Sequence, residues 1–85
     1  MSRDYTEIEA RNDTTIIRKN ANDKYFLRRK MMSLNIIIRN AEICISAQEG
    51  FEKIDRYEEI TVARNNLILC ELLLDMIHTK ENFQE

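Results

Sequence analysis

Proline and tryptophan are absent from the 85-residue sequence, and there is a single glycine. A β-sandwich or β-barrel needs a turn about every 8–12 residues, and those turns depend on glycine and proline. The composition therefore argues against turn-rich β folds and predicts an all-α protein. The absence of proline also excludes proline-rich linkers and recognition tails. A chain of this length is enough for one helical domain, which we place at residues 1–85.

Long apolar runs are absent as well. No uncharged apolar stretch of the sequence reaches the roughly 18–20 residues that a membrane span requires. Residues 1–7 lack the apolar core of a secretory signal peptide. The sequence therefore predicts a cytoplasmic protein with no membrane partner.

Side chains that bind metals or act as nucleophiles are few, because the chain has two cysteines, Cys44 and Cys70, and one histidine, His78. A structural zinc site needs about four ligands at short spacings, whereas the two cysteines are 26 positions apart. We expect both thiols to be free, as is usual in a cytosolic chain, and we expect no metal, cofactor or catalytic residue. A single glycine also excludes a glycine-rich phosphate loop. We therefore predict that the protein is not an enzyme.

Three helices are predicted, at about residues 5–19, 24–49 and 55–79. Gly50 follows a long apolar-periodic segment and precedes Phe51. This order is typical of a helix that ends with glycine at C′ and a hydrophobic residue at C″.

Capping signals mark the expected helix starts. Asn22 or Asp23 can cap the second helix. Residues 4–7 and 55–58 each have aspartate followed three positions later by glutamate, which resembles a capping box. Glu59, beside the third start, is interpreted together with Glu58 as a solvated acid near a helix end.

The second and third segments each repeat apolar residues at alternating spacings of four and three, the pattern of two helices that pack side by side. In the second segment this inner seam consists of Leu27, Met31, Leu34, Ile38, Ala41 and Ile45. In the third it consists of Ile60, Ala63, Leu67, Cys70, Leu74 and Ile77. Because the connection around Gly50 is short, the two helices are expected to be antiparallel. The pattern predicts a long antiparallel helical hairpin with a short N-terminal helix packed or swapped against it.

Apolar side chains remain outside this hairpin seam. On the second segment they are Tyr25, Met32, Ile36 and Ile43. On the third they are Ile68, Leu69, Leu72 and Met76. The first segment has too few apolar residues to cover both stripes, and eight large side chains left in water forgo on the order of 10 kcal/mol. We therefore predict a homo-oligomer, a dimer or higher, in which oligomerisation completes a helical bundle.

The two stripes are assigned different roles. The stripe on the third segment is the candidate oligomer interface, and the stripe on the second is expected to bind another protein outside self-association. Arginines flank the second stripe, as is typical of helices that dock on proteins; they are Arg28, Arg29 and Arg39. The alternative is that the first helix covers this stripe with Ile8, Ile16 and Ile17, which leaves nothing for a partner.

The two halves of the chain differ in charge. Residues 1–40 hold nine basic and five acidic residues, a balance of +4, and residues 41–85 hold four and ten, a balance of −6. One interpretation is a face that binds nucleic acid or nucleotide phosphates, with candidate residues Arg28, Arg29, Lys30, Arg39 and Arg64. The other is internal neutralisation by the acids near the end of the third helix, Glu71, Asp75 and Glu81.

A polar belt is expected where residues 39–40 lie level with residues 64–66. It forms either a small anion pocket or a polar flank that fixes the helix register, as buried asparagine does in coiled coils.

Residues 62–67, which lead into an apolar helix, resemble the last helix of small phage proteins that sequester cyclic oligonucleotide signals. The resemblance covers about a dozen residues and implies a nucleotide ligand as the alternative function. Twelve isoleucines and eight asparagines against five alanines indicate an A+T-rich coding sequence, as in many phages, mobile elements and Firmicutes.

Overall fold

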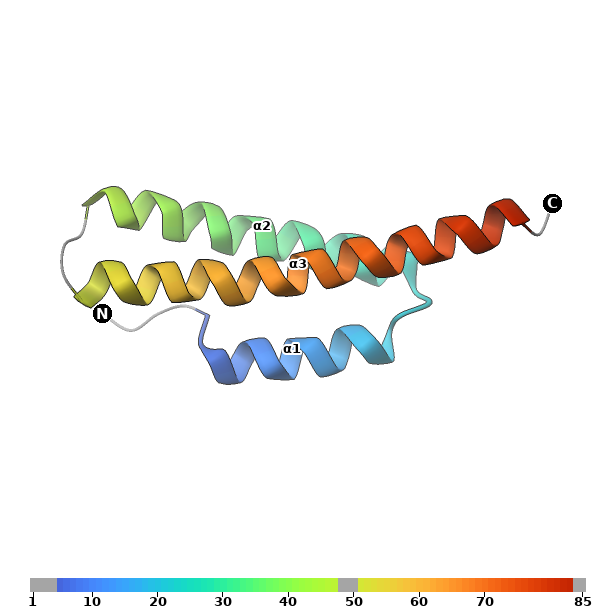
Figure 1. Ribbon diagram of the computed structural model, residues 1–85, viewed down its shortest axis with the longest axis horizontal. Coiled ribbons are helices and arrows are strands. Elements are labelled where there is room, and N and C mark those ends of the chain that lie inside the picture. The colour runs from blue at the N-terminus through green and yellow to red at the C-terminus, as the bar shows by residue number, and fades with distance from the viewer. Residues whose placement is uncertain (1–4, 48–50, 84–85) are drawn as a thin grey trace.

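The computed structural model describes residues 5–47 and 51–83, which form three helices (Figure 1). Helix α1 spans Glu7–Lys19, α2 spans Lys24–Ala47 and α3 spans Phe51–Phe83. No strand occurs in these two ranges, so the predicted all-α class is confirmed. Helices α2 and α3 lie side by side and run in opposite directions, and α1 packs against α3 (Figure 1). The molecule is elongated, at 54 × 21 × 15 Å.

The first two helices begin at side-chain caps. The Oδ1 atom of Asp23 accepts a hydrogen bond from the Phe26 amide at 3.0 Å, so Asp23 rather than Asn22 caps α2. Thr6 caps α1, because its Oγ1 atom accepts from the Glu9 amide at 3.1 Å. The expected cap at Asp4 lies outside the described residues, and α1 begins two positions later than predicted.

Helix α3 is longer than predicted at both ends. The capping box expected at residues 55–58 is wrong, because the helix begins at Phe51 and Asp55 is an exposed residue inside it. No glycine or proline interrupts residues 51–58, and extending an existing helix by one residue costs far less than starting a new one. For the same reason α3 continues beyond residue 79 to Phe83. The helix end expected at Gly50 lies outside the described residues.

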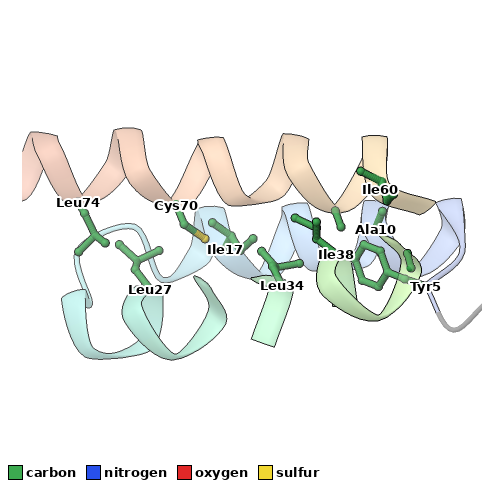
Figure 2. Packing of buried hydrophobic residues seen from close by; sticks show 11 residues of the cluster. Tyr5, Ala10, Ile17, Leu27, Leu34, Ile38, Ile60, Cys70 and Leu74 are labelled. Carbon is green, nitrogen blue, oxygen red and sulfur yellow. The ribbon is translucent and has the colours of Figure 1, made fainter. Parts of the chain in front are cut away.

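The core lies between α2 and α3 and is closed on one side by α1 (Figure 2). Every member of the predicted inner seam is buried or packs partly buried against the core. Helix α1 contributes Ala10 and Ile17, and Tyr5, from the segment before α1, lies near Ala10. Cys70 is buried, Cys44 is half-buried, and both thiols are free as predicted. Among the described helices, none has an apolar segment long enough to cross a membrane.

Candidate interaction surfaces

A buried asparagine anchors α1 on α3. The Nδ2 atom of Asn66 donates to the Tyr5 hydroxyl and to the Ala10 carbonyl oxygen, each at 2.9 Å. The Thr14 hydroxyl lies 2.7 Å from Asn66 Oδ1 and 2.9 Å from the Ala10 carbonyl oxygen, so its one proton can serve either acceptor. Asn66 is only 3% exposed. These contacts satisfy a polar side chain that would otherwise be costly to bury.

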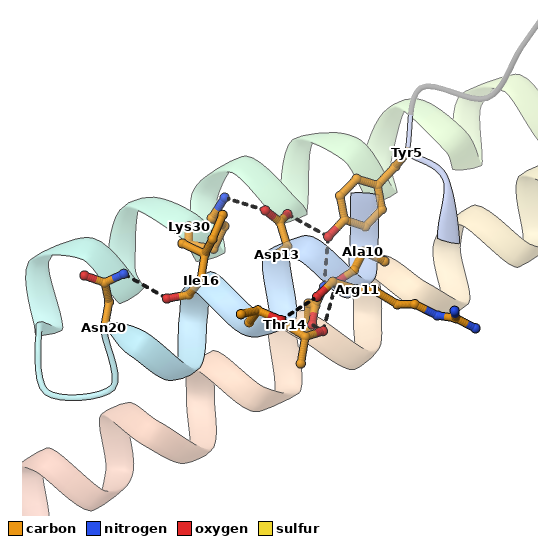
Figure 3. A network of polar contacts seen from close by, with 10 residues as sticks. Tyr5, Ala10, Arg11, Asp13, Thr14, Ile16, Asn20 and Lys30 are labelled. Atoms are coloured by element: carbon orange, nitrogen blue, oxygen red, sulfur yellow. Dashed lines mark hydrogen bonds and ion pairs between the residues drawn. The ribbon is translucent and has the colours of Figure 1, made fainter. Parts of the chain in front are cut away.

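The same network reaches α2 through Asp13 (Figure 3). The Tyr5 hydroxyl donates to Asp13 Oδ2 at 2.7 Å, and Lys30 Nζ donates to Asp13 Oδ1 at 3.1 Å. Burial raises the pKa of Tyr5 well above its ordinary value, and the hydrogen bond to Asp13 raises it further. Lys30 Nζ also lies 5.8 Å from the centre of the Phe26 ring. Lys30, a candidate phosphate ligand, therefore links α2 to α1 through Asp13.

The structure divides the expected polar belt. Asn66 belongs to the contact with α1, and Asn65 is exposed. Arg39 and Asn40 line one shallow hollow, and Arg64 lines another. The hypothesis of a single anion pocket built from these residues is therefore not supported by their positions.

A buried ion pair lies inside the first half of α3. Arg56 Nη1 donates to Glu59 Oε1 at 2.9 Å, and the Glu59 side chain is 1% exposed. The interpretation of Glu59 as a solvated acid is wrong, whereas Glu58 is exposed as expected. The error follows from the helix start: once α3 begins at Phe51, Glu59 is an interior residue on the face toward the core. An arginine three residues earlier in a helix is close enough to pair with it.

Four large apolar side chains are exposed on the side of α2 that faces away from α3. This α2 outer stripe consists of the predicted residues Tyr25, Met32, Ile36 and Ile43. Each is between 59% and 75% exposed. The alternative that α1 covers the stripe is wrong, because Ile17 packs into the core while Ile8 is 70% exposed and Ile16 is also exposed.

Two shallow hollows accompany the α2 outer stripe. The first is about 370 Å³ and is lined by Tyr25, Arg28, Arg29 and Met32. The second is about 250 Å³ and is lined by Met32, Asn35, Ile36, Arg39 and Asn40. The structure thus brings the candidate partner residues together with three of the candidate phosphate ligands on one helix face.

A second exposed stripe lies on the side of α3 that faces away from α2. This α3 outer stripe consists of Ile68, Leu72 and Met76, each between 47% and 58% exposed. Leu69, which the spacing assigns to the same stripe, is partly buried against the core instead. At about 100° per residue it points toward the side of α3 that carries Asn66.

Sequence reasoning missed three further exposed apolar side chains on α3, namely Ile54, Tyr57 and Phe83. Ile54 and Phe83 lie outside the predicted helix at residues 55–79, so the predicted stripe on the third segment did not include them. Ile54 and Tyr57 line a hollow of about 440 Å³ together with Glu7, Glu58, Thr61 and Val62. This hollow carries acidic residues, in contrast to the arginine-lined hollows on α2.

Internal neutralisation accounts for part of the basic segment. Lys24 Nζ lies 2.8 Å from Glu81 Oε2, and His78 Nδ1 lies 3.6 Å from Glu81 Oε1. The hydrogen bond from Lys24 lowers the pKa of Glu81. Across residues 5–47 and 51–83, no ion pair involves the arginines proposed for phosphate binding: Arg28, Arg29, Arg39 and Arg64.

In the part of the chain that the structure describes, no group of three or more histidine, cysteine, aspartate and glutamate residues is placed to hold a metal ion. Burial raises the pKa of the Cys70 thiol, which lies in the core.

No protein-family model, curated protein or solved structure matches this chain.

Proposed function

We propose that this is a small non-enzymatic helical protein that acts by self-association and by binding another protein, as a regulator, adaptor or inhibitor. The observation that carries the proposal is the pair of exposed apolar stripes on the outer sides of α2 and α3. Monomeric proteins rarely leave large contiguous apolar patches in water. The isoleucine- and asparagine-rich composition favours a phage or mobile element as the setting.

In this proposal α2 and α3 act as a helical hairpin whose bundle is completed by further copies. The α3 outer stripe drives self-association, because its side chains are large, apolar and separated by single helical turns. The α2 outer stripe receives the second protein, because methionine adapts to imperfectly matched surfaces and arginine and tyrosine are common in binding hot spots. The buried polar side chains support a structural role, since Arg56, Glu59 and Asn66 are all bonded within the molecule.

Leu72→Asp tests the self-association part of the proposal. Burying a charged side chain in place of an apolar one at an interface costs several kcal/mol, so sedimentation should show wild-type protein above the 10.2 kDa monomer mass and the variant at that mass. Ile8→Asp is the matched control, because Ile8 is also a large exposed apolar residue but lies in the first turn of α1. A dimer with a dissociation constant of about 10 µM is mostly assembled at about 100 µM. A wild-type chain that sediments as a monomer at that concentration contradicts self-association.

A nucleotide or nucleic-acid ligand is the second candidate function, and the hollow beside Tyr25 favours it. Arg28 and Arg29 line this hollow together with the Tyr25 ring, so that it offers both cations for phosphate and a surface for base stacking. Binding of single-stranded, double-stranded or cyclic nucleotides at low salt, lost in Arg28→Glu/Arg29→Glu and weakened steeply by added salt, is the expected result. No binding to any of them removes this candidate.

A further inference from the structure

The two outer stripes are built to the same pattern. On α2, exposed residues follow one another at spacings of four and three through Tyr25, Arg29, Met32, Ile36, Arg39 and Ile43. On α3 the same spacings connect Thr61, Asn65, Ile68, Leu72, Met76, Thr79 and Phe83, with one additional step of four. At about 100° per residue, each stripe lies roughly opposite the inner seam of its own helix. Each helix therefore carries a second seam of the kind that packs against another helix.

The two stripes carry opposite charges. Within about 60° of the centre of the α2 outer stripe, the charged side chains are all arginines, namely Arg28, Arg29 and Arg39. Within the same angle of the centre of the α3 outer stripe they are Glu58 and Asp75, both exposed acids. The hollow at the start of α3 is also lined by Glu7, whose charge is already paired with Arg11 at 3.0 Å. One surface is apolar with a basic rim, and the other is apolar with an acidic rim.

We propose that the α3 outer stripe of one copy docks on the α2 outer stripe of a second copy. The inference rests on the self-association proposed above and names its geometry. Pairing unlike stripes places apolar side chains against each other and Asp75 of one copy beside arginines of the next. Pairing two α2 stripes instead juxtaposes arginines, and like charges across an interface are costly. The charge pattern therefore favours the heterologous contact over a symmetric contact between two α2 stripes.

This contact changes the role expected of α2. Each copy carries one stripe of each kind, so the assembly adds copies until it closes into a ring or grows as a filament. The α2 outer stripe is then covered in every copy except one at an open end. A separate protein partner competes with a second copy for the same surface, and self-association regulates partner binding. The expectation that the α2 outer stripe takes no part in self-association is thereby replaced.

Two variants with complementary defects test the geometry. Ile36→Asp places an acid on the α2 outer stripe, which meets the acidic rim of the neighbour. Leu72→Arg places a base on the α3 outer stripe, which meets the arginine rim of the neighbour. Each variant alone should sediment as a monomer. An equimolar mixture should form a 1:1 heterodimer, because each variant retains the stripe that the other needs. The two stripes left in the heterodimer each have a charged residue in place of a large apolar one, so growth beyond the heterodimer should be much weaker than wild-type assembly.

Other outcomes of the same experiment overturn the inference. If Ile36→Asp assembles like the wild type and Leu72→Arg is a monomer that forms no mixed dimer, α3 pairs with α3, and self-association stands while this geometry fails. If both variants are monomers that do not combine, the heterologous contact is wrong. A monomeric wild-type chain removes both proposals. Ile8→Asp, away from both stripes, should assemble like the wild type.

A charge-only variant covers the case in which Leu72→Arg fails to fold, as judged by circular dichroism. Arg28→Glu/Arg39→Glu changes two exposed side chains and leaves the core intact. Assembly should weaken at least tenfold at low salt, and added salt, which screens the new repulsion, should narrow the difference from the wild type. An unchanged assembly constant means that the arginine rim does not face an acidic stripe, and it overturns the inference.

Discussion

Asn66 and Tyr5 are 61 positions apart in the sequence, and a 2.9 Å hydrogen bond joins the Asn66 amide to the Tyr5 hydroxyl in the buried contact between α1 and α3. Tyr5 is itself 3% exposed, so both partners have left water. A buried polar group without a partner costs more than the bond contributes when it is made. The placement of α1 therefore depends on this polar match as well as on the apolar contact of Ile17.

Asn66→Ala should lower the free energy of unfolding by about 1–3 kcal/mol. The substitution leaves the Tyr5 hydroxyl and the Ala10 carbonyl oxygen without their shared donor. Urea denaturation followed by circular dichroism measures the loss, and amide exchange should accelerate in α1 before it does in α2. Asn65→Ala is the matched control, because the neighbouring Asn65 is exposed and should change stability little. Equal effects of the two variants contradict the anchoring role.

The raised pKa of Tyr5 predicts a loss of stability at alkaline pH. The phenol binds its proton more tightly in the folded than in the unfolded chain, so its contribution is complete below pH 10 and declines as the pH rises above that value. In Tyr5→Phe this component is absent. The difference in free energy of unfolding between wild type and Tyr5→Phe should therefore be constant from pH 7 to 9 and shrink above about pH 10. A difference that grows above pH 10 shows the opposite sign and contradicts the prediction.

The Arg56–Glu59 pair predicts a non-additive response. Glu59→Leu alone leaves the buried Arg56 charge without this carboxylate and should destabilise the chain by about 3–5 kcal/mol. Arg56→Met/Glu59→Leu removes both charges and keeps the volume apolar, so its cost should be much smaller. Thermal melting of Arg56→Met, Glu59→Leu and the double variant gives the coupling free energy between the two side chains. If the double variant loses as much as the two single variants together, the pair contributes no coupling and the buried contact is not an ion pair.

The sequence predicts those parts of the fold that follow from helical periodicity. Leu27, Leu34 and Ala63 recur at spacings of four and three with their neighbours, and all three are buried. Ile36 and Leu72 fall outside that period, and both are exposed. Periodicity is a property of one helix, so it needs no knowledge of the other elements.

Contacts between elements were not predictable in the same way. Asn66 was expected beside Arg39, but it bonds to Tyr5 and Ala10, and nothing local to residue 66 indicates which helix it faces. Glu59 was misassigned because the Asp-x-x-Glu pattern at residues 55–58 outweighed the absence of a helix breaker after Phe51. The helix extends back to Phe51 because nothing interrupts it. This earlier start makes Glu59 an interior residue and lengthens the exposed apolar surface of α3.

Ile36 and Leu34 lie two positions apart on α2, and they make the distinction between surface and core testable in a single helix. Leu34 is fully buried, whereas Ile36 is 59% exposed. Leu34→Arg places a charge in the core and should lower the melting temperature by about 10 °C or more. Ile36→Arg should change it by no more than a few degrees, because arginine at an exposed helical position is well tolerated. Differential scanning calorimetry at a concentration where the chain is monomeric separates this comparison from any effect of assembly. If Ile36→Arg melts as early as Leu34→Arg under those conditions, Ile36 belongs to the core and the α2 outer stripe is not an interaction surface.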